Sequence, residues 1–157
     1  MNSSLVMTIQ SILAPALGIS AMGLLLLGLT NRYSSMVNRI RLLTAEKRKY
    51  LNTIIEKGEL EYTENIRLAS IIKQIGDLLY RSKLSRNAIL CLQTSIILFV
   101  LTSVTIGINA FFQNNPVEMF ALILFLAGMI FVLVGILYSA WEIHNSFKIA
   151  ELEVKVE

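Results

Sequence analysis

The sequence has few of the residues from which catalytic and metal sites are usually built. Its 157 residues include one cysteine, Cys91, and one histidine, His144. A single cysteine excludes an intramolecular disulfide framework, and these two residues alone do not make a ligand set with zinc-site spacing. Glycine-rich phosphate loops are absent, and Glu118 and Glu142 flank an apolar run at opposite ends, too far apart for a catalytic carboxylate pair. We therefore expect no enzyme activity, no metal and no cofactor.

Charge is missing from three long stretches, residues 5–29, 88–112 and 119–141. Each is longer than the roughly 20 residues that a helix needs to cross about 30 Å of hydrocarbon. The composition, 55% hydrophobic and 16% charged, is also more apolar than that of an ordinary soluble domain. We predict an all-α membrane protein with three transmembrane helices, at residues 1–30, 88–112 and 118–141.

Basic residues are distributed very unevenly along the chain. Of the 14 Lys and Arg, 12 lie in residues 31–87, and none precedes the first apolar run or lies in residues 113–117. A secretory signal peptide would begin with positive charge, so the first helix is expected to be retained. Positive segments stay in the cytoplasm, which predicts an external N-terminus, a short external loop at 113–117, and a cytoplasmic tail at 142–157.

Residues 31–87 show the periodicity of helices rather than that of a disordered loop. Apolar residues recur three or four positions apart in two sets: Tyr33, Val37, Ile40, Leu43, Leu51, Ile54 and Ile55, and then Leu68, Ile71, Ile72, Ile75, Leu78 and Leu79. Gly58, between the two sets, indicates a turn. The pattern predicts a cytoplasmic antiparallel helical hairpin between the first and second transmembrane helices. The first transmembrane helix should continue into it without a cap, and the apolar sets should pack on each other or on neighbouring subunits.

A basic collar is expected where this hairpin meets the membrane. Its candidate residues are Asn31, Arg32, Asn38, Arg39, Arg81, Lys83 and Arg86. One interpretation is a topology signal that also attracts anionic lipid head groups, at about 1 kcal/mol for each basic residue. In the other interpretation, Asn31 and Asn38 of the repeated Asn-Arg pair form hydrogen bonds to another helix or to a phosphate. Glu142 lies close enough in depth to neutralise part of this charge.

Small and polar residues inside the expected spans indicate helix contacts. The candidates for close packing are Ala14, Gly18, Ala21, Gly128 and Gly135, with Ala121 continuing the seven-residue spacing of the last two. Pro15 removes one backbone hydrogen bond from the first helix.

The second span carries a polar face made of Ser95, Thr102, Thr105 and Asn109. Serine and threonine in such helices usually bond their own backbone carbonyls, whereas Asn109 needs another helix or water. Two interpretations stay open, a hydrogen-bonded helix contact and a hydrated path.

One segment has a familiar pattern: an apolar helix with proline and serine, an Asn-Arg at its end, and an Arg-x-Arg after it. The segment "IQSILAPALGISAMGLLLLGLTNRYSSMVNRIRLLTAEKR" resembles the start of a family of small bacterial membrane proteins, domain of unknown function 2721. The resemblance implies a helical membrane protein of the bacterial inner membrane. It implies no activity, substrate or catalytic residue.

Two functional hypotheses follow from these observations. The first is a homo-oligomeric scaffold or partner-binding protein that acts through its cytoplasmic hairpin, next to a bilayer with anionic head groups. The second is a homo-oligomeric ion channel or pore lined by the polar face of the second span. We favour the scaffold, because no span carries the buried charge that usually marks an ion route. Nothing in the sequence indicates nucleic-acid binding.

Overall fold

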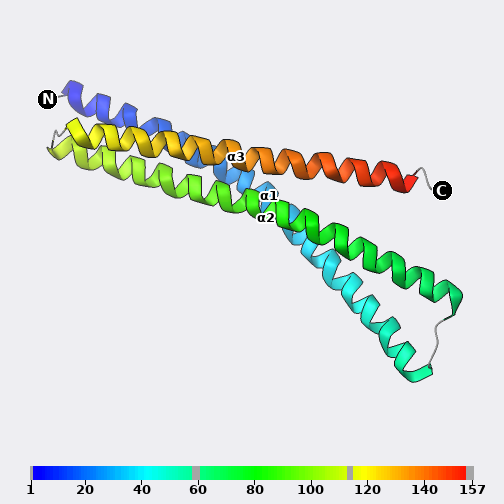
Figure 1. Ribbon diagram of the computed structural model, residues 1–157. Helices are drawn as coiled ribbons and strands as arrows, with labels where there is room; N and C mark the ends of the chain where they lie inside the picture. Colours follow the sequence, from blue (N-terminus) through cyan, green and yellow to red (C-terminus); the bar gives the residue numbers. More distant parts are fainter. Residues whose placement is uncertain (1, 58–60, 113–114, 155–157) are drawn as a thin grey trace.

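The protein folds into three long helices, of which the second is the common packing partner of the first and the third. A computed structural model describes residues 2–57, 61–112 and 115–154. Within these residues the helices are α1 (Asn2–Lys57), α2 (Tyr62–Phe112) and α3 (Asn115–Val154). Helix α2 packs against both α1 and α3, whereas α1 and α3 barely touch each other. In Figure 1, α2 and α3 run side by side through one half of the molecule, and α3 separates from the other two helices in the second half.

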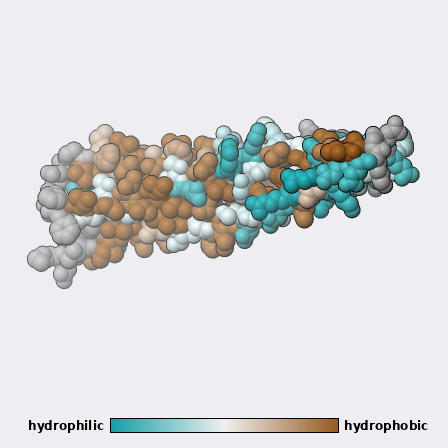
Figure 2. Space-filling model, turned by 90° about the horizontal axis from the view of Figure 1, so that it is seen from below, coloured by the Kyte–Doolittle hydropathy of each residue, from teal (hydrophilic) through white to brown (hydrophobic). Residues whose placement is uncertain are grey.

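Each of the three helices contains a stretch that is long and apolar enough to cross a membrane. On the face of the molecule shown in Figure 2, one half of the surface is almost continuously hydrophobic and the other half is mainly hydrophilic. Monomeric soluble proteins rarely expose an apolar surface of that extent. The prediction of an all-helical protein with three helices is therefore confirmed, and each helix is a candidate membrane span by its length and composition.

Helix α1 passes from its apolar half into its polar half without interruption, as the sequence predicts. No capping residue or break occurs between Asn2 and Lys57. Pro15 lies inside the helix and is fully buried. Proline is tolerated in a membrane helix when neighbouring groups satisfy the backbone that it leaves unbonded.

Beyond the apolar half, α1 and α2 continue as two arms, residues 33–57 and 62–80. The arms diverge towards the connection between them (Figure 1). An exposed ion pair joins them, in which Arg67 Nε donates to Glu46 Oε1 at 3.1 Å. The hydrogen bond to Glu46, and then its negative charge, raise the pKa of the Arg67 guanidinium above its ordinary value. Exposed pairs of this kind contribute little to stability. The turn predicted at Gly58 lies outside the described residues.

Buried positions recur every seven residues, which keeps one face of each helix against its neighbour. In α1 these positions include Pro15, Met36 and Leu43; in α2 they include Ile71, Ser85, Leu92 and Phe99; in α3 they are Ala121, Gly128, Gly135 and Glu142. The predicted arm faces are therefore only partly right. Leu43 and Ile71 are buried, whereas Ile55, Ile72 and Leu79 are exposed because they turn away from this narrow seam.

The connections near α3 also differ from the sequence-based boundaries. Residues 115–117 were expected in the external loop, but α3 already begins at Asn115. Pro116 suits that first turn, because its missing N–H would have had no helical partner there. At the other end, α3 continues past the expected span boundary at 141 to Val154, so most of the segment expected as a tail is helical.

Candidate functional site

The most unusual group in the described residues is the carboxylate of Glu142, which is fully buried. It occupies the fourth place in the seven-residue series that begins with Ala121, so the same geometry that buries Gly128 and Gly135 also buries Glu142. The charge-free run of α3 ends immediately before it. A carboxylate at such a position is costly unless it is paired and hydrogen-bonded.

Side chains from the other two helices supply that pairing. Arg32 of α1 places its Nη2 at 3.0 Å from Glu142 Oε2 and donates to Oε1 at 3.2 Å. From α2, Arg81 Nη2 donates to Oε1 at 3.4 Å. The hydroxyl of Ser85, one turn further along α2 and itself buried, donates to Oε2 at 3.3 Å. One carboxylate thus joins all three helices, although α1 and α3 make few other contacts.

The charges in this cluster do not cancel. Two guanidinium groups face one carboxylate, which leaves a net charge of about +1, since arginine stays protonated in proteins. The side chains of Arg32 and Arg81 are 41% and 28% exposed, so the positive charge is partly accessible from outside while Glu142 is enclosed. Arg81 Nε is buried and has no hydrogen-bond partner among the described residues. The arrangement can hold the helices together and still attract an anion.

Of the predicted collar, the structure brings Arg32 and Arg81 together on Glu142. The other five candidates have exposed side chains: Asn31, Asn38, Arg39, Lys83 and Arg86. Sequence reasoning placed Glu142 near the collar, but it missed the burial of the carboxylate and the contribution of Ser85. The seven-residue spacing from Ala121 through Gly135 to Glu142 was the available signal for that burial.

The predicted packing glycines surround one aromatic side chain. A Cβ built on Gly18 of α1 would lie 3.1 Å from Phe99 of α2, and one on Gly128 of α3 would lie 2.8 Å from the same ring. Gly135 lies similarly close to Leu92 and to a backbone carbonyl of α2. The absence of side chains at these glycines lets α1 and α3 approach α2 closely.

The two alanines of the predicted packing set behave differently. Ala14 and Ala21 are exposed, so the packed face of α1 lies at Pro15 and Gly18 instead. The glycines of the set therefore lie close to α2, whereas Ala14 and Ala21 are not buried among the described residues.

The polar face of α2 is partly enclosed. Ser95 and Thr102 are buried, and Thr102 donates to the Leu98 carbonyl at 2.8 Å. Thr105 likewise donates to a carbonyl of its own helix. Asn109 Nδ2 donates to Glu118 Oε1 of α3 at 3.2 Å, so in this structure the amide bonds another helix, one of the two partners that the sequence leaves open.

Comparison with known proteins adds a family but no activity. A protein-family model described as "Protein of unknown function (DUF2721)" matches residues 12–152. That range contains Arg32, Arg81, Ser85 and Glu142. No curated protein and no solved structure was found to match the chain.

Proposed function

Because the chain belongs to this family of proteins of unknown function, we propose its function from the structure: it is a self-associating scaffold of the bacterial inner membrane. The three helices form the membrane anchor, and the arms form the surface on which copies assemble. In this proposal the N-terminus is external, while the arms and the C-terminal end are cytoplasmic, following the distribution of basic residues.

The observation that carries the proposal is the apolar surface of the arms. Ile55 is 81% exposed, and Figure 2 shows a hydrophobic patch near the far end of the otherwise hydrophilic half. The other large side chains exposed on the arms are Leu42, Leu51, Tyr62, Ile66, Ile72, Leu79 and Tyr80. If the arms lie in water, these groups favour burial against a partner.

A second copy of the same chain fits that surface. The arm of α1 exposes Arg41 and Arg48, which share the seven-residue spacing of Ile55, and the arm of α2 carries the acidic residue Glu64 in its first turn. Two copies packed through their arms can therefore bury apolar side chains and face opposite charges at the rim, which is the usual anatomy of a specific interface.

Cross-linking in native membranes tests self-association through the arms. In a Cys91→Ser background, Ile55→Cys is expected to give a disulfide-linked dimer on mild oxidation. Lys49→Cys is the matched control, because Lys49 is also exposed on the same arm but lies on a different side of the helix. Equal cross-linking at both positions would contradict a specific arm interface.

The strength of association provides a second measurement. Ile55→Lys combined with Ile66→Lys should weaken self-association at least tenfold, since each buried isoleucine is worth about 1.5–3 kcal/mol. Native mass spectrometry of the detergent-solubilised chain would report the shift from oligomer to monomer. A wild-type chain that is strictly monomeric under these conditions would rule the scaffold out.

Orientation has its own test. Single cysteines replacing Asn114 and Gly58, again in a Cys91→Ser background, should differ in their reaction with a membrane-impermeant thiol reagent applied to intact cells. We expect labelling at Asn114→Cys and none at Gly58→Cys, because 12 of 14 basic residues lie in the segment around Gly58. The reverse pattern would invert the topology and place the arms outside.

The pore hypothesis receives less support from the geometry. Two of its four lining candidates, Ser95 and Thr102, are buried within the single chain. A hydrated path along this face would require α2 to rotate or α3 to move away. The burial favours the alternative in which the polar face is a helix contact, which agrees with a scaffold.

A further inference from the structure

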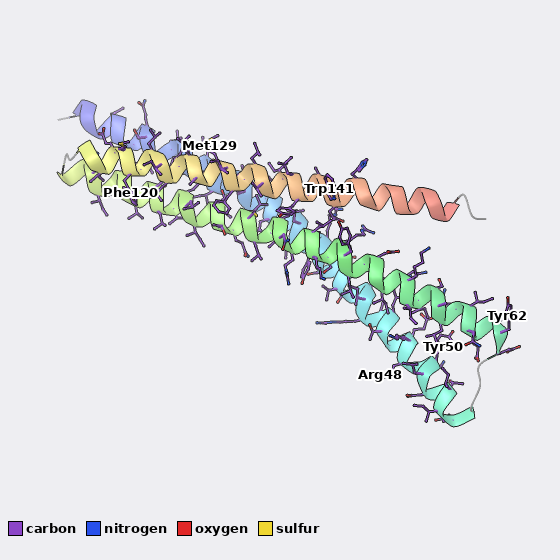
Figure 3. All side chains as sticks on the ribbon, in the orientation of Figure 1. Arg48, Tyr50, Tyr62, Phe120, Met129 and Trp141 are labelled. Atoms are coloured by element: carbon purple, nitrogen blue, oxygen red, sulfur yellow. The ribbon has the colours of Figure 1, made fainter. Side chains whose placement is uncertain are left out.

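A cavity lies between α2 and α3, near the region where α3 begins to separate from its neighbours. In Figure 3, α3 diverges from α2 in the region marked by Trp141. The cavity has a volume of about 330 Å³ and is lined by Leu84 from α2 and by Val134, Leu137, Tyr138 and Trp141 from α3. This is near the lower end of the size range of small-molecule sites in proteins.

The lining is suited to a hydrocarbon chain. Its side chains are aliphatic or aromatic, and those of α3 belong to the charge-free run that forms the third span. Leu137 and Trp141 are about 60% exposed, so the cavity is open along its side rather than enclosed. Tryptophan and tyrosine prefer the level of the lipid head groups, where their rings contact chains and their polar atoms contact water.

Positive charge lies at one end of this cavity. Arg81 precedes the lining residue Leu84 by one helical turn, and its partner Glu142 follows the lining residue Trp141 directly. Glu142 is shared with Arg32, so the group carries a net charge of about +1. Arg81 keeps 28% of its side chain accessible, and its Nε has no acceptor within the described residues.

We propose that this cavity binds one anionic phospholipid. An acyl chain lies along Leu84, Leu137 and Trp141, and the phosphate pairs with the accessible part of Arg81. Guanidinium groups bind phosphate through charge-assisted hydrogen bonds, and a single phosphate would neutralise the excess charge of the cluster. The occupant is a phospholipid because the cavity opens where the apolar span ends. The acyl chain of the lipid can therefore contact the apolar lining while its phosphate contacts Arg81. The proposal does not depend on self-association.

The single tryptophan of the chain provides a direct probe, because Trp141 lines the cavity. The full chain is reconstituted in phosphatidylcholine bilayers that contain increasing fractions of brominated phosphatidylglycerol or of brominated phosphatidylcholine. Bromine quenches tryptophan fluorescence on contact, so the two titrations give the relative affinity of the site for the two lipids. We expect about a fivefold preference for phosphatidylglycerol, because one basic residue near the membrane surface contributes about 1 kcal/mol to its attraction for anionic lipid.

Three variants separate this site from general attraction by the collar. Arg81→Gln should bring the preference close to one, and Arg86→Gln, which removes an exposed charge of the collar, should retain it. Val134→Phe fills the cavity without touching any charge and should also abolish the preference. It carries the test alone if Arg81→Gln does not fold, as judged by helical circular dichroism.

Equal quenching of the wild type by both lipids would overturn the proposal. So would a fivefold preference that survives in Arg81→Gln, because the collar as a whole would then be responsible. A preference that survives in Val134→Phe would show a head-group contact without the acyl-chain site and would refute the cavity as the binding site.

Discussion

Glu142→Gln is expected to lower the free energy of unfolding by about 3 kcal/mol. The substitution keeps the size of the side chain but removes the charge that Arg32 and Arg81 share, and it leaves two guanidinium groups close together without their counter-ion. Removing one partner of a buried ion pair typically costs about 3–5 kcal/mol. We expect the lower end of that range because both arginines are partly exposed and therefore partly solvated. Denaturant titration in detergent, followed by circular dichroism, measures the loss.

Two comparisons identify the cause of that loss. Glu118→Gln changes another acid that bonds across helices, but Glu118 is exposed, so its cost should stay below about 1 kcal/mol. The double variant Glu142→Gln with Arg81→Gln should be less destabilised than the two single effects predict together, because each change removes the charge that the other leaves unpaired. Additive effects, or equal costs for the two acids, would show that Glu142 does not hold the helices together electrostatically.

The general architecture could be predicted from the sequence because it follows from local properties. A stretch of more than 20 residues without charge indicates a membrane helix, and this inference does not depend on the segments that pack against it. The uninterrupted passage of α1 past Asn31 was also predictable, since no proline or glycine follows Gly28 before the polar half begins. The packing glycines of α3 were found because their seven-residue spacing is visible in the sequence itself.

The cluster around Glu142 was harder to predict because it depends on the relative rotation of three helices. Sequence alone places Glu142 at the end of the last span, where an acid is usually interfacial and exposed. Its burial requires Arg32 and Arg81 to face it from two other helices, and these lie 110 and 61 residues away. Ser85 could not be distinguished from its neighbour Ser82 without knowing which face of α2 meets α3.

The arms show a similar limit in the use of periodicity. A three-and-four spacing defines a broad apolar face, and the prediction placed Leu43 and Ile55 on the same one. The diverging arms bury only a narrow seam, so Leu43 is buried and Ile55 is exposed. How much of an apolar face is covered depends on the angle between the helices, which short-range spacing does not determine. The uncovered remainder is the surface assigned above to a second copy.

Gly128→Leu should be the most disruptive of the glycine substitutions, with a loss of about 1–3 kcal/mol. A Cβ at this position would lie 2.8 and 3.0 Å from two carbons of the Phe99 ring, closer than non-bonded carbons normally approach. The ring cannot easily move away, because Gly18 contacts it from α1 and Phe125 packs against it at a centroid distance of 5.5 Å. Overpacking a well-filled core costs free energy of this order.

Gly28→Leu is the matched control, since a Cβ at Gly28 meets nothing within 4 Å and the residue is exposed. It should not lower stability, because the new side chain meets no neighbour and leucine favours the helix more than glycine does. The role of the ring is then tested by combining Gly128→Leu with Phe99→Ala. The space left by the phenyl group can accept the new leucine, so the double variant should be more stable than the sum of the single effects by about 1 kcal/mol or more. Denaturant titrations of all four variants supply the comparison.

Two outcomes would contradict this prediction: Gly128→Leu could be as harmless as Gly28→Leu, or the effects of Gly128→Leu and Phe99→Ala could simply add. In either case Phe99 is not held between two glycines, and the close approach of α1 and α3 to α2 has another cause.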